Sequence, residues 1–152
     1  MVVFMSPDDI QKQTEHSIQS AIFCWANKAE RVGFEAAMDM RCYYNESTLD
    51  LYEIKPVPDL HWLHAIPNGG LRNKPEALKM KAEGVKSGVL DLCLPVPRHC
   101  AHGLYIECKK PKEQLSANQK LFAQHLIDNG YMWTMITSWR DAADYLQWYL
   151  SK

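Results

Sequence analysis

An acidic residue lies in each of two neighbouring segments that the sequence predicts to be β-strands, residues 89–96 and 103–109. Side chains alternate between the two faces of a strand. Alternation places Glu107 and Lys109 on one face of the second segment, and it places the leucines that flank Asp91 on the opposite face from its carboxylate. If the two segments pair as a hairpin, we expect Asp91, Glu107 and Lys109 to form one polar cluster.

A hairpin turn centred on His99 would put Asp91 directly opposite Glu107, with Cβ atoms about 4.5–5.5 Å apart. Two carboxylates at that separation repel each other unless a cation lies between them. Carboxylate oxygens suit Mg²⁺ or Mn²⁺, and such ions activate water and stabilise the leaving oxygen of a phosphodiester. Lys109 would orient or deprotonate the water, or neutralise the phosphoryl oxygens. A bare Glu-x-Lys is also common in ordinary exposed strands, and two prolines in the turn leave the register open.

The elements that must position these residues follow from caps and from apolar spacing. Helices are predicted at 7–29 after Ser6, at 73–83 with Asn73 and Glu76 as a capping box, at 116–129 after Ser116, and from Ser138 onward. Strands are predicted within 59–66 and at 89–96, 103–109 and 131–137, with Pro67-Asn68-Gly69-Gly70 as a turn. Residues 35–57 are ambiguous, and the alternation at 49–53 indicates a strand or a meander. This order predicts an α/β fold with a mixed sheet between helices.

Composition restricts the class of protein. A chain of 152 residues with 47% hydrophobic and 23% charged residues predicts one globular domain, 1–152. The absence of a long apolar run argues against a membrane partner. The five cysteines form no Cys-x-x-Cys pair and predict reduced thiols in a cytoplasmic protein. The net charge is −1, but residues 72–120 carry +5 and the remainder −6. A basic segment around two acids fits phosphate binding, but charge alone favours a solvated helix face and a charged turn.

Three stretches around the cluster resemble the virus-type replication-repair nuclease domain, VRR-NUC, a branch of the PD-(D/E)XK nucleases. They are Gly84-Val85-Lys86-Ser87-Gly88-Val89-Leu90-Asp91-Leu92, then Leu104-Tyr105-Ile106-Glu107-Cys108-Lys109-Lys110-Pro111, then Leu115-Ser116 with Gln119. Pro67-Asn68-Gly69-Gly70 is also similar to that family. The resemblance covers roughly residues 60–137 and implies a restriction-endonuclease-like mixed central sheet flanked by helices. The family's proline before the aspartate is Leu90 here, and residues 35–57 have no counterpart.

The resemblance also implies roles for individual residues. Lys109 would be the catalytic lysine, acting with Asp91 and Glu107, and Gln119 matches a glutamine of the family. The implied ligands of one or two Mg²⁺ or Mn²⁺ ions are the side chains of Glu15, Asp91 and Glu107 and the backbone carbonyl of Cys108. From the residues alone, Gln119 is also explained as the third residue of a capping box with Ser116, and Glu15 as a solvated helix acid.

Small stand-alone members of this family resemble Holliday-junction resolvases. The implied activity is a structure-selective DNA endonuclease that acts as a homodimer on branched or duplex DNA in a bacterial or phage-infected cell. A four-way junction has two strands to cut symmetrically, which suits a two-fold dimer. Two alternatives stay open: a restriction-type enzyme that reads sequence through residues 35–57, and an inactive DNA-binding module of the same fold.

Two further groups of residues have competing explanations. His99-Cys100-Ala101-His102 is either a hairpin turn or, less in keeping with standard motifs, a zinc site. The aromatic residues near the C-terminus are expected to be core or dimer-interface residues more than platforms for bases; they are Trp133, Trp139, Trp148 and Tyr149.

Overall fold

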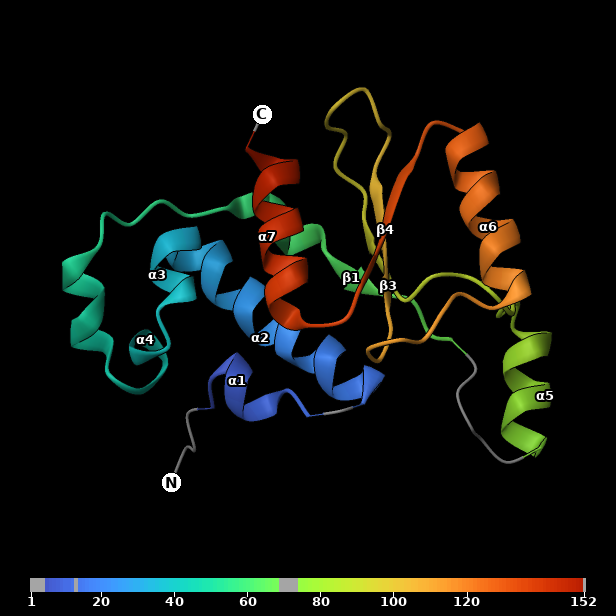
Figure 1. Cartoon of the computed structure of the whole chain (residues 1–152), viewed down its shortest axis with the longest axis horizontal. Coiled ribbons are helices and arrows are strands. Elements are labelled where there is room, and N and C mark those ends of the chain that lie inside the picture. The colour runs from blue at the N-terminus through green and yellow to red at the C-terminus, as the bar shows by residue number, and fades with distance from the viewer. Residues whose placement is uncertain (1–4, 13, 69–73, 152) are drawn as a thin grey trace.

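A four-stranded mixed sheet stands between two groups of helices in the computed structural model, which describes residues 5–12, 14–68 and 74–151 (Figure 1). The strands are β1 His64–Ala65, β2 Leu92–Leu94, β3 Leu104–Cys108 and β4 Met132–Ile136. The α-helices are α1 Pro7–Ile10, α2 Glu15–Val32, α3 Phe34–Met38, α4 Arg41–Tyr44, α5 Lys74–Ala82, α6 Ala117–Asp128 and α7 Trp139–Leu150. Two 3₁₀-helices complete the described elements: η1 Glu46–Leu51 and η2 Pro58–Trp62.

The sheet order is β1-β2-β3-β4, with two antiparallel pairs followed by one parallel pair. Strand β3 is central and fully apolar on one face, where Leu104, Ile106 and Cys108 are completely buried. The parallel step from β3 to β4 requires a crossover, and α6 supplies it. The predicted α/β fold with a mixed sheet flanked by helices is confirmed, although each strand is shorter than its apolar segment.

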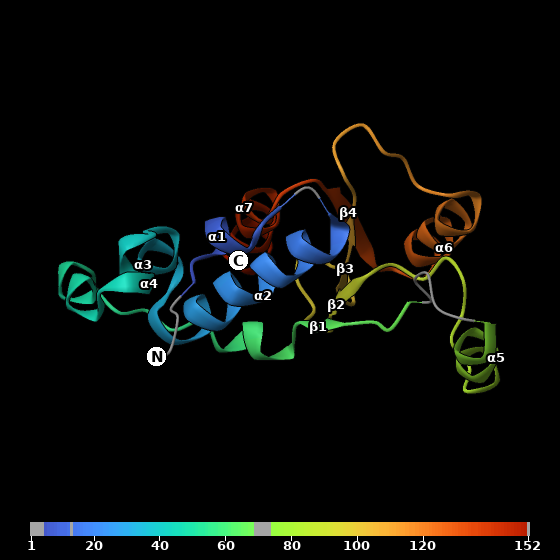
Figure 2. The ribbon, with the colours of Figure 1, turned by 90° about the horizontal axis from the view of Figure 1, so that it is seen from below.

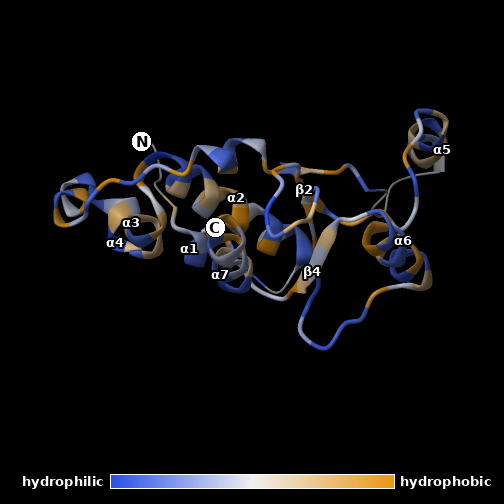
Figure 3. Ribbon diagram, turned by 90° about the horizontal axis from the view of Figure 1, so that it is seen from above, coloured by the Kyte–Doolittle hydropathy of each residue, from blue (hydrophilic) through white to orange (hydrophobic). Residues whose placement is uncertain are grey.

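The main core lies on the face of the sheet that α2 and α7 cover. Ile18, Ile22 and Trp25 of α2 pack there with the buried side chains of β3, and Leu146 of α7 joins them. Figure 3 shows the apolar stretches of α2 lying against α7 and the sheet. Helix α6 lies on the opposite side of the sheet, and α5 projects from the body beyond β1 and β2 (Figures 1 and 2). None of the described helices combines the length and the hydropathy that crossing a bilayer requires.

The predicted first helix is in fact two helices. Gln11 is extended and ends α1, and Thr14 begins α2 by accepting a hydrogen bond from the backbone N–H of Ser17. The side chain of Ser17 in turn accepts from the backbone N–H of Thr14, which completes a capping box. The prediction of a single helix was wrong because the apolar residues keep helical spacing from Ile10 into α2, whereas the helical backbone is interrupted between α1 and α2.

The strand or meander suggested for residues 49–53 is also wrong. Residues 34–51 form the helical turns α3, α4 and η1, which pack as an extension at the far end of α2 (Figure 2). Gly33 makes this possible: its φ is +95°, and a Cβ there would meet the carbonyl oxygen of Lys55 at 2.5 Å. The predicted helix cap Asn73 and the glycines Gly69 and Gly70 of the predicted turn lie outside the described residues.

Candidate active site

The hairpin of β2 and β3 brings the two acids together as its register predicts. Leu92 pairs with Ile106 and Leu94 pairs with Leu104. Continuing this register by one residue places Asp91 opposite Glu107. The expectation of a turn centred on His99 is therefore confirmed, and the left-handed backbone of His99 and Cys100 (φ 51° and 62°) makes that turn.

Lys109 bridges two carboxylates from distant parts of the chain. Its Nζ lies 2.9 Å from Oε1 of Glu107 and 3.1 Å from Oε1 of Glu15. Glu15 is the first residue of α2, so the start of that helix reaches the end of β3. Burial alone would lower the pKa of Lys109, but its hydrogen bonds to Glu107 and Glu15 outweigh burial and raise it. The lysine is therefore a cation held between two acids, with only 12% of its side chain exposed.

Gln119 both caps its helix and contacts the cluster. Its Oε1 accepts a hydrogen bond of 2.9 Å from the backbone N–H of Ser116, and its own backbone N–H donates one of 3.2 Å to Oγ of Ser116. Its Nε2 donates to Oε1 of Glu107. The capping box that the sequence predicts for this glutamine is confirmed. The same side chain also contacts Glu107, because its amide has a separate acceptor and donor.

Asp91 is held at both carboxylate oxygens. Its Oδ2 accepts a hydrogen bond of 2.9 Å from the backbone N–H of Cys108, and its Oδ1 accepts one of 3.1 Å from Nδ2 of Asn68. The contact with Asn68 was not predicted, because its partner Asp91 is 23 residues away along the chain. The stretch Pro67-Asn68-Gly69-Gly70, already noted for its likeness to the family, was the signal that could have identified it.

Glu107 is the least satisfied charged group of the cluster. Its residue is 1% exposed, and its Oε2 has no hydrogen-bond partner among the described residues. Burial, and then the nearby charge of Asp91, raises the pKa of Glu107 to about 7. A buried carboxylate oxygen without a partner, beside a second carboxylate, is a donor set that suits a hard divalent cation. The residues present therefore fit such an ion.

The loop before Asp91 is pressed against the first turn of α6. Gly88 has a φ of +88°, and a Cβ at this position would lie 2.5 Å from Cβ of Asn118. Nearby, Nδ2 of Asn118 donates a hydrogen bond of 3.1 Å to Oγ of Ser87. Only glycine permits this approach, which sets the segment that carries Asp91 beside the helix that carries Gln119.

The other candidate residues have structural contacts. His99 stacks on Trp148 at 4.4 Å between ring centroids, and His102 packs edge-on against Tyr131 at 5.6 Å. Across residues 5–12, 14–68 and 74–151, no three His, Cys, Asp or Glu side chains gather as a preformed metal cluster. All five cysteines are free thiols. Trp139 and Tyr149 are core residues as expected.

Comparison with known proteins agrees with this geometry. The family model of the VRR-NUC domain matches residues 13–139. A solved structure described as a VRR_NUC domain protein superposes with a TM-score of 0.63, at 23% sequence identity, over 93% of this chain and 91% of that chain. No curated protein matches the sequence. The fold is thus that of the PD-(D/E)XK nucleases, and the chain belongs to the VRR-NUC family of nucleases.

Proposed function

We propose that this protein is a divalent-metal-dependent, structure-selective DNA endonuclease that hydrolyses phosphodiester bonds, with branched DNA such as a Holliday junction as its substrate. The observation that carries the proposal is the meeting of Asp91, Glu107 and Lys109 at one end of the β2–β3 hairpin. Glu107 is buried there, and one of its carboxylate oxygens has no hydrogen-bond partner within the described ranges, which supports a role in binding a cation.

Each residue has a distinct role in this proposal. Asp91, Glu107 and the carbonyl of Cys108 would hold Mg²⁺ or Mn²⁺, one or two ions per site, with Glu15 as the further ligand. When bound, such an ion supplies positive charge to the phosphate and makes water a stronger nucleophile. Lys109, held as an ammonium by Glu15 and Glu107, orients the attacking water and neutralises phosphoryl oxygens. Gln119 keeps the carboxylate of Glu107 in one orientation.

Exposed lysines near this end of the sheet provide contacts for a phosphate backbone. They are Lys79, Lys81, Lys86, Lys110, Lys112 and Lys120. Helix α5 carries the first two and projects from the body near α6 (Figure 1). Contacts of this kind fix the register of DNA without reading its sequence, which supports recognition of shape. A cut in each of two strands of a junction would follow from a homodimer with two sites in matching geometry.

One experiment tests the proposal against its alternatives. The purified protein is incubated with four-way junction, flap, single-stranded and linear duplex DNA, with Mg²⁺ or Mn²⁺ and with EDTA. We expect metal-dependent cleavage that is fastest on branched substrates. Equal rates on junction and linear duplex would remove the structure-selective claim, and cleavage at one short duplex sequence would indicate a restriction-type enzyme. Binding without cleavage in either metal would indicate an inactive DNA-binding module.

A further inference from the structure

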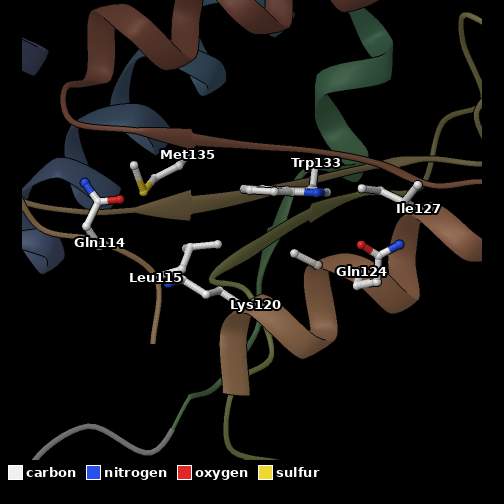
Figure 4. Close-up of a pocket in the computed structure, with 8 residues that line it drawn as sticks. Gln114, Leu115, Lys120, Gln124, Ile127, Trp133 and Met135 are labelled. Atoms are coloured by element: carbon white, nitrogen blue, oxygen red, sulfur yellow. The ribbon is translucent and has the colours of Figure 1, made fainter. Parts of the chain in front are cut away.

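A cavity of about 290 Å³ lies between α6 and β4, next to the cluster of Asp91, Glu107 and Lys109. Its walls include the side chains of Gln114, Leu115, Lys120, Gln124, Trp133 and Met135 (Figure 4). The volume is close to the lower limit of ligand pockets, which begin at about 300 Å³. None of these residues belongs to the machinery proposed above except Lys120, as one of several exposed lysines.

The register of the parallel strands fixes how near the cavity lies to Glu107. Glu107 pairs with Met135, and Tyr105 pairs with Trp133. Neighbouring strands are about 4.8 Å apart, so Met135 stands one strand away from Glu107 and on the same face of the sheet. On the opposite wall, Lys120 directly follows Gln119. The cavity therefore begins one strand spacing, about 4.8 Å, from Glu107.

The chemistry of the walls suits a flat heterocycle. In Figure 4 the indole of Trp133 is seen edge-on, with a flat face turned toward Leu115, Lys120 and Gln124. Aromatic faces bind bases of any sequence by stacking. Gln114 adds an amide that can donate and accept, and Gln124 keeps a carbonyl oxygen after its Nε2 donates 2.9 Å to Oδ1 of Asp128. Lys120 is exposed and lines the cavity, so it adds a cation that can contact a phosphate next to the base.

We propose that this cavity receives one unpaired base of the DNA substrate, adjacent to the phosphate that is cut, and stacks it on Trp133. The inference rests on the proposed nuclease function and deepens it. A base at a branch point or flap costs less to unstack than one inside a continuous duplex. A pocket that must be filled before the phosphate is aligned would therefore favour branched DNA without reading its sequence.

The test removes the base or the ring, separately and together. The position of cleavage is first mapped on a branched substrate, and abasic sites are then placed one nucleotide at a time on either side of it. Trp133→Leu keeps an apolar side chain in β4 but removes the aromatic face, and Trp133→Phe restores a ring. Trp62→Leu is the matched control, because this tryptophan is exposed on η2. Thermal unfolding of each variant verifies that it is folded.

We expect one abasic position to slow cleavage by the unsubstituted protein about 5- to 150-fold. Trp133→Leu should lose a similar factor on the intact strand and little more on that abasic strand, while Trp133→Phe and Trp62→Leu stay near the unsubstituted rate. Equal sensitivity of Trp133→Leu and the unsubstituted protein to every abasic position would overturn the pocket. The proposal would also be overturned if Trp133→Leu changed the protein from dimer to monomer and lost the same factor of cleavage on all substrates. The cavity would then be a contact between two copies of the chain. If the unsubstituted protein cuts no DNA at all, the nuclease proposal fails first.

Discussion

The side-chain amide of Gln119 donates to the carboxylate of Glu107 while it closes the capping box of α6 with Ser116. The start of a helix and the orientation of a buried acid therefore depend on one side chain. The two contacts use different atoms of the amide, Oε1 for the cap and Nε2 for Glu107. Substitutions can therefore separate the effect on the helix from the effect on the acid.

We expect Gln119→Ala to lower both stability and activity, because it removes the reciprocal cap and frees the carboxylate of Glu107. The loss of activity should be about 10- to 100-fold, as for other residues that orient metal ligands. Ser116→Ala is the matched control: it removes the acceptor for the N–H of Gln119 at a cost of about 1 kcal/mol, and it leaves the contact with Glu107. Denaturant unfolding and cleavage rates measure the two effects. Equal activity of both variants would contradict the positioning role of Gln119.

Lys109→Met should abolish most of the cleavage while the protein stays folded and binds DNA. The loss should be at least about 100-fold, the effect of removing one preorganised charged donor from an active site. Lys55→Met is the control, because this lysine is 68% exposed, pairs only with Glu53 in the described part of the chain, and lies on the loop that precedes η2. Single-turnover cleavage and filter binding would be measured together. Retained cleavage in Lys109→Met would remove the lysine from the mechanism.

Glu107→Gln should stabilise the metal-free protein at alkaline pH. The folded-state pKa of Glu107 is raised from 4.5 to about 7, so the protonated acid favours the folded state below pH 4.5, and this contribution is lost as pH rises through about 7. A neutral amide avoids that loss. At pH 8 we expect the melting temperature of the variant to exceed that of the unsubstituted protein by about 2–4 °C for each kcal/mol of stability recovered. At pH 4.5 the two melting temperatures should differ little.

The same pair tests the metal site by scanning fluorimetry. Mn²⁺ should raise the melting temperature of the unsubstituted protein more at pH 8 than at pH 6, because the pKa of Glu107 is about 7 and its carboxylate is ionised at the higher pH. Glu107→Gln should lose most of this shift. Glu53→Gln, on a side chain that is 76% exposed, should behave as the unsubstituted protein does in both metal-free and Mn²⁺ buffers. An undiminished Mn²⁺ shift in Glu107→Gln would place the cation elsewhere.

Substitution of Lys79 and Lys81 by alanine should weaken DNA binding without changing the rate at which bound DNA is cleaved. Both side chains are exposed on α5, which lies apart from the core. Each phosphate contact that is lost should reduce the slope of log affinity against log salt by about 1. Arg31→Ala, at the far end of α2, provides the control. Affinities measured across a salt series, with an unchanged slope in the double variant, would exclude α5 from the DNA contact surface.

Period-two alternation led to the observed hairpin register only on the condition that the turn centres on His99, because the two prolines in the turn left the register open. It also located Glu107 and Lys109 on one face. It could not predict that Glu15 pairs with Lys109, since that contact depends on how α2 packs under the whole sheet. The break between α1 and α2 was missed for a local reason: the Thr14–Ser17 capping box lies within continuous apolar spacing. Asn68 was missed because its partner, Asp91, is 23 residues away.

The contacts that assemble the cluster differ greatly in their separation along the chain. Asp91 and Cys108 are 17 residues apart, whereas Glu15 and Lys109 are 94 apart. Short loops close at a lower entropic cost than long ones, so the pair of carboxylates can form while α2 is still undocked. We therefore expect a refolding chain to capture Mn²⁺ before it can cut DNA. The order of assembly would itself delay cleavage until α2 has docked and Glu15 has reached Lys109.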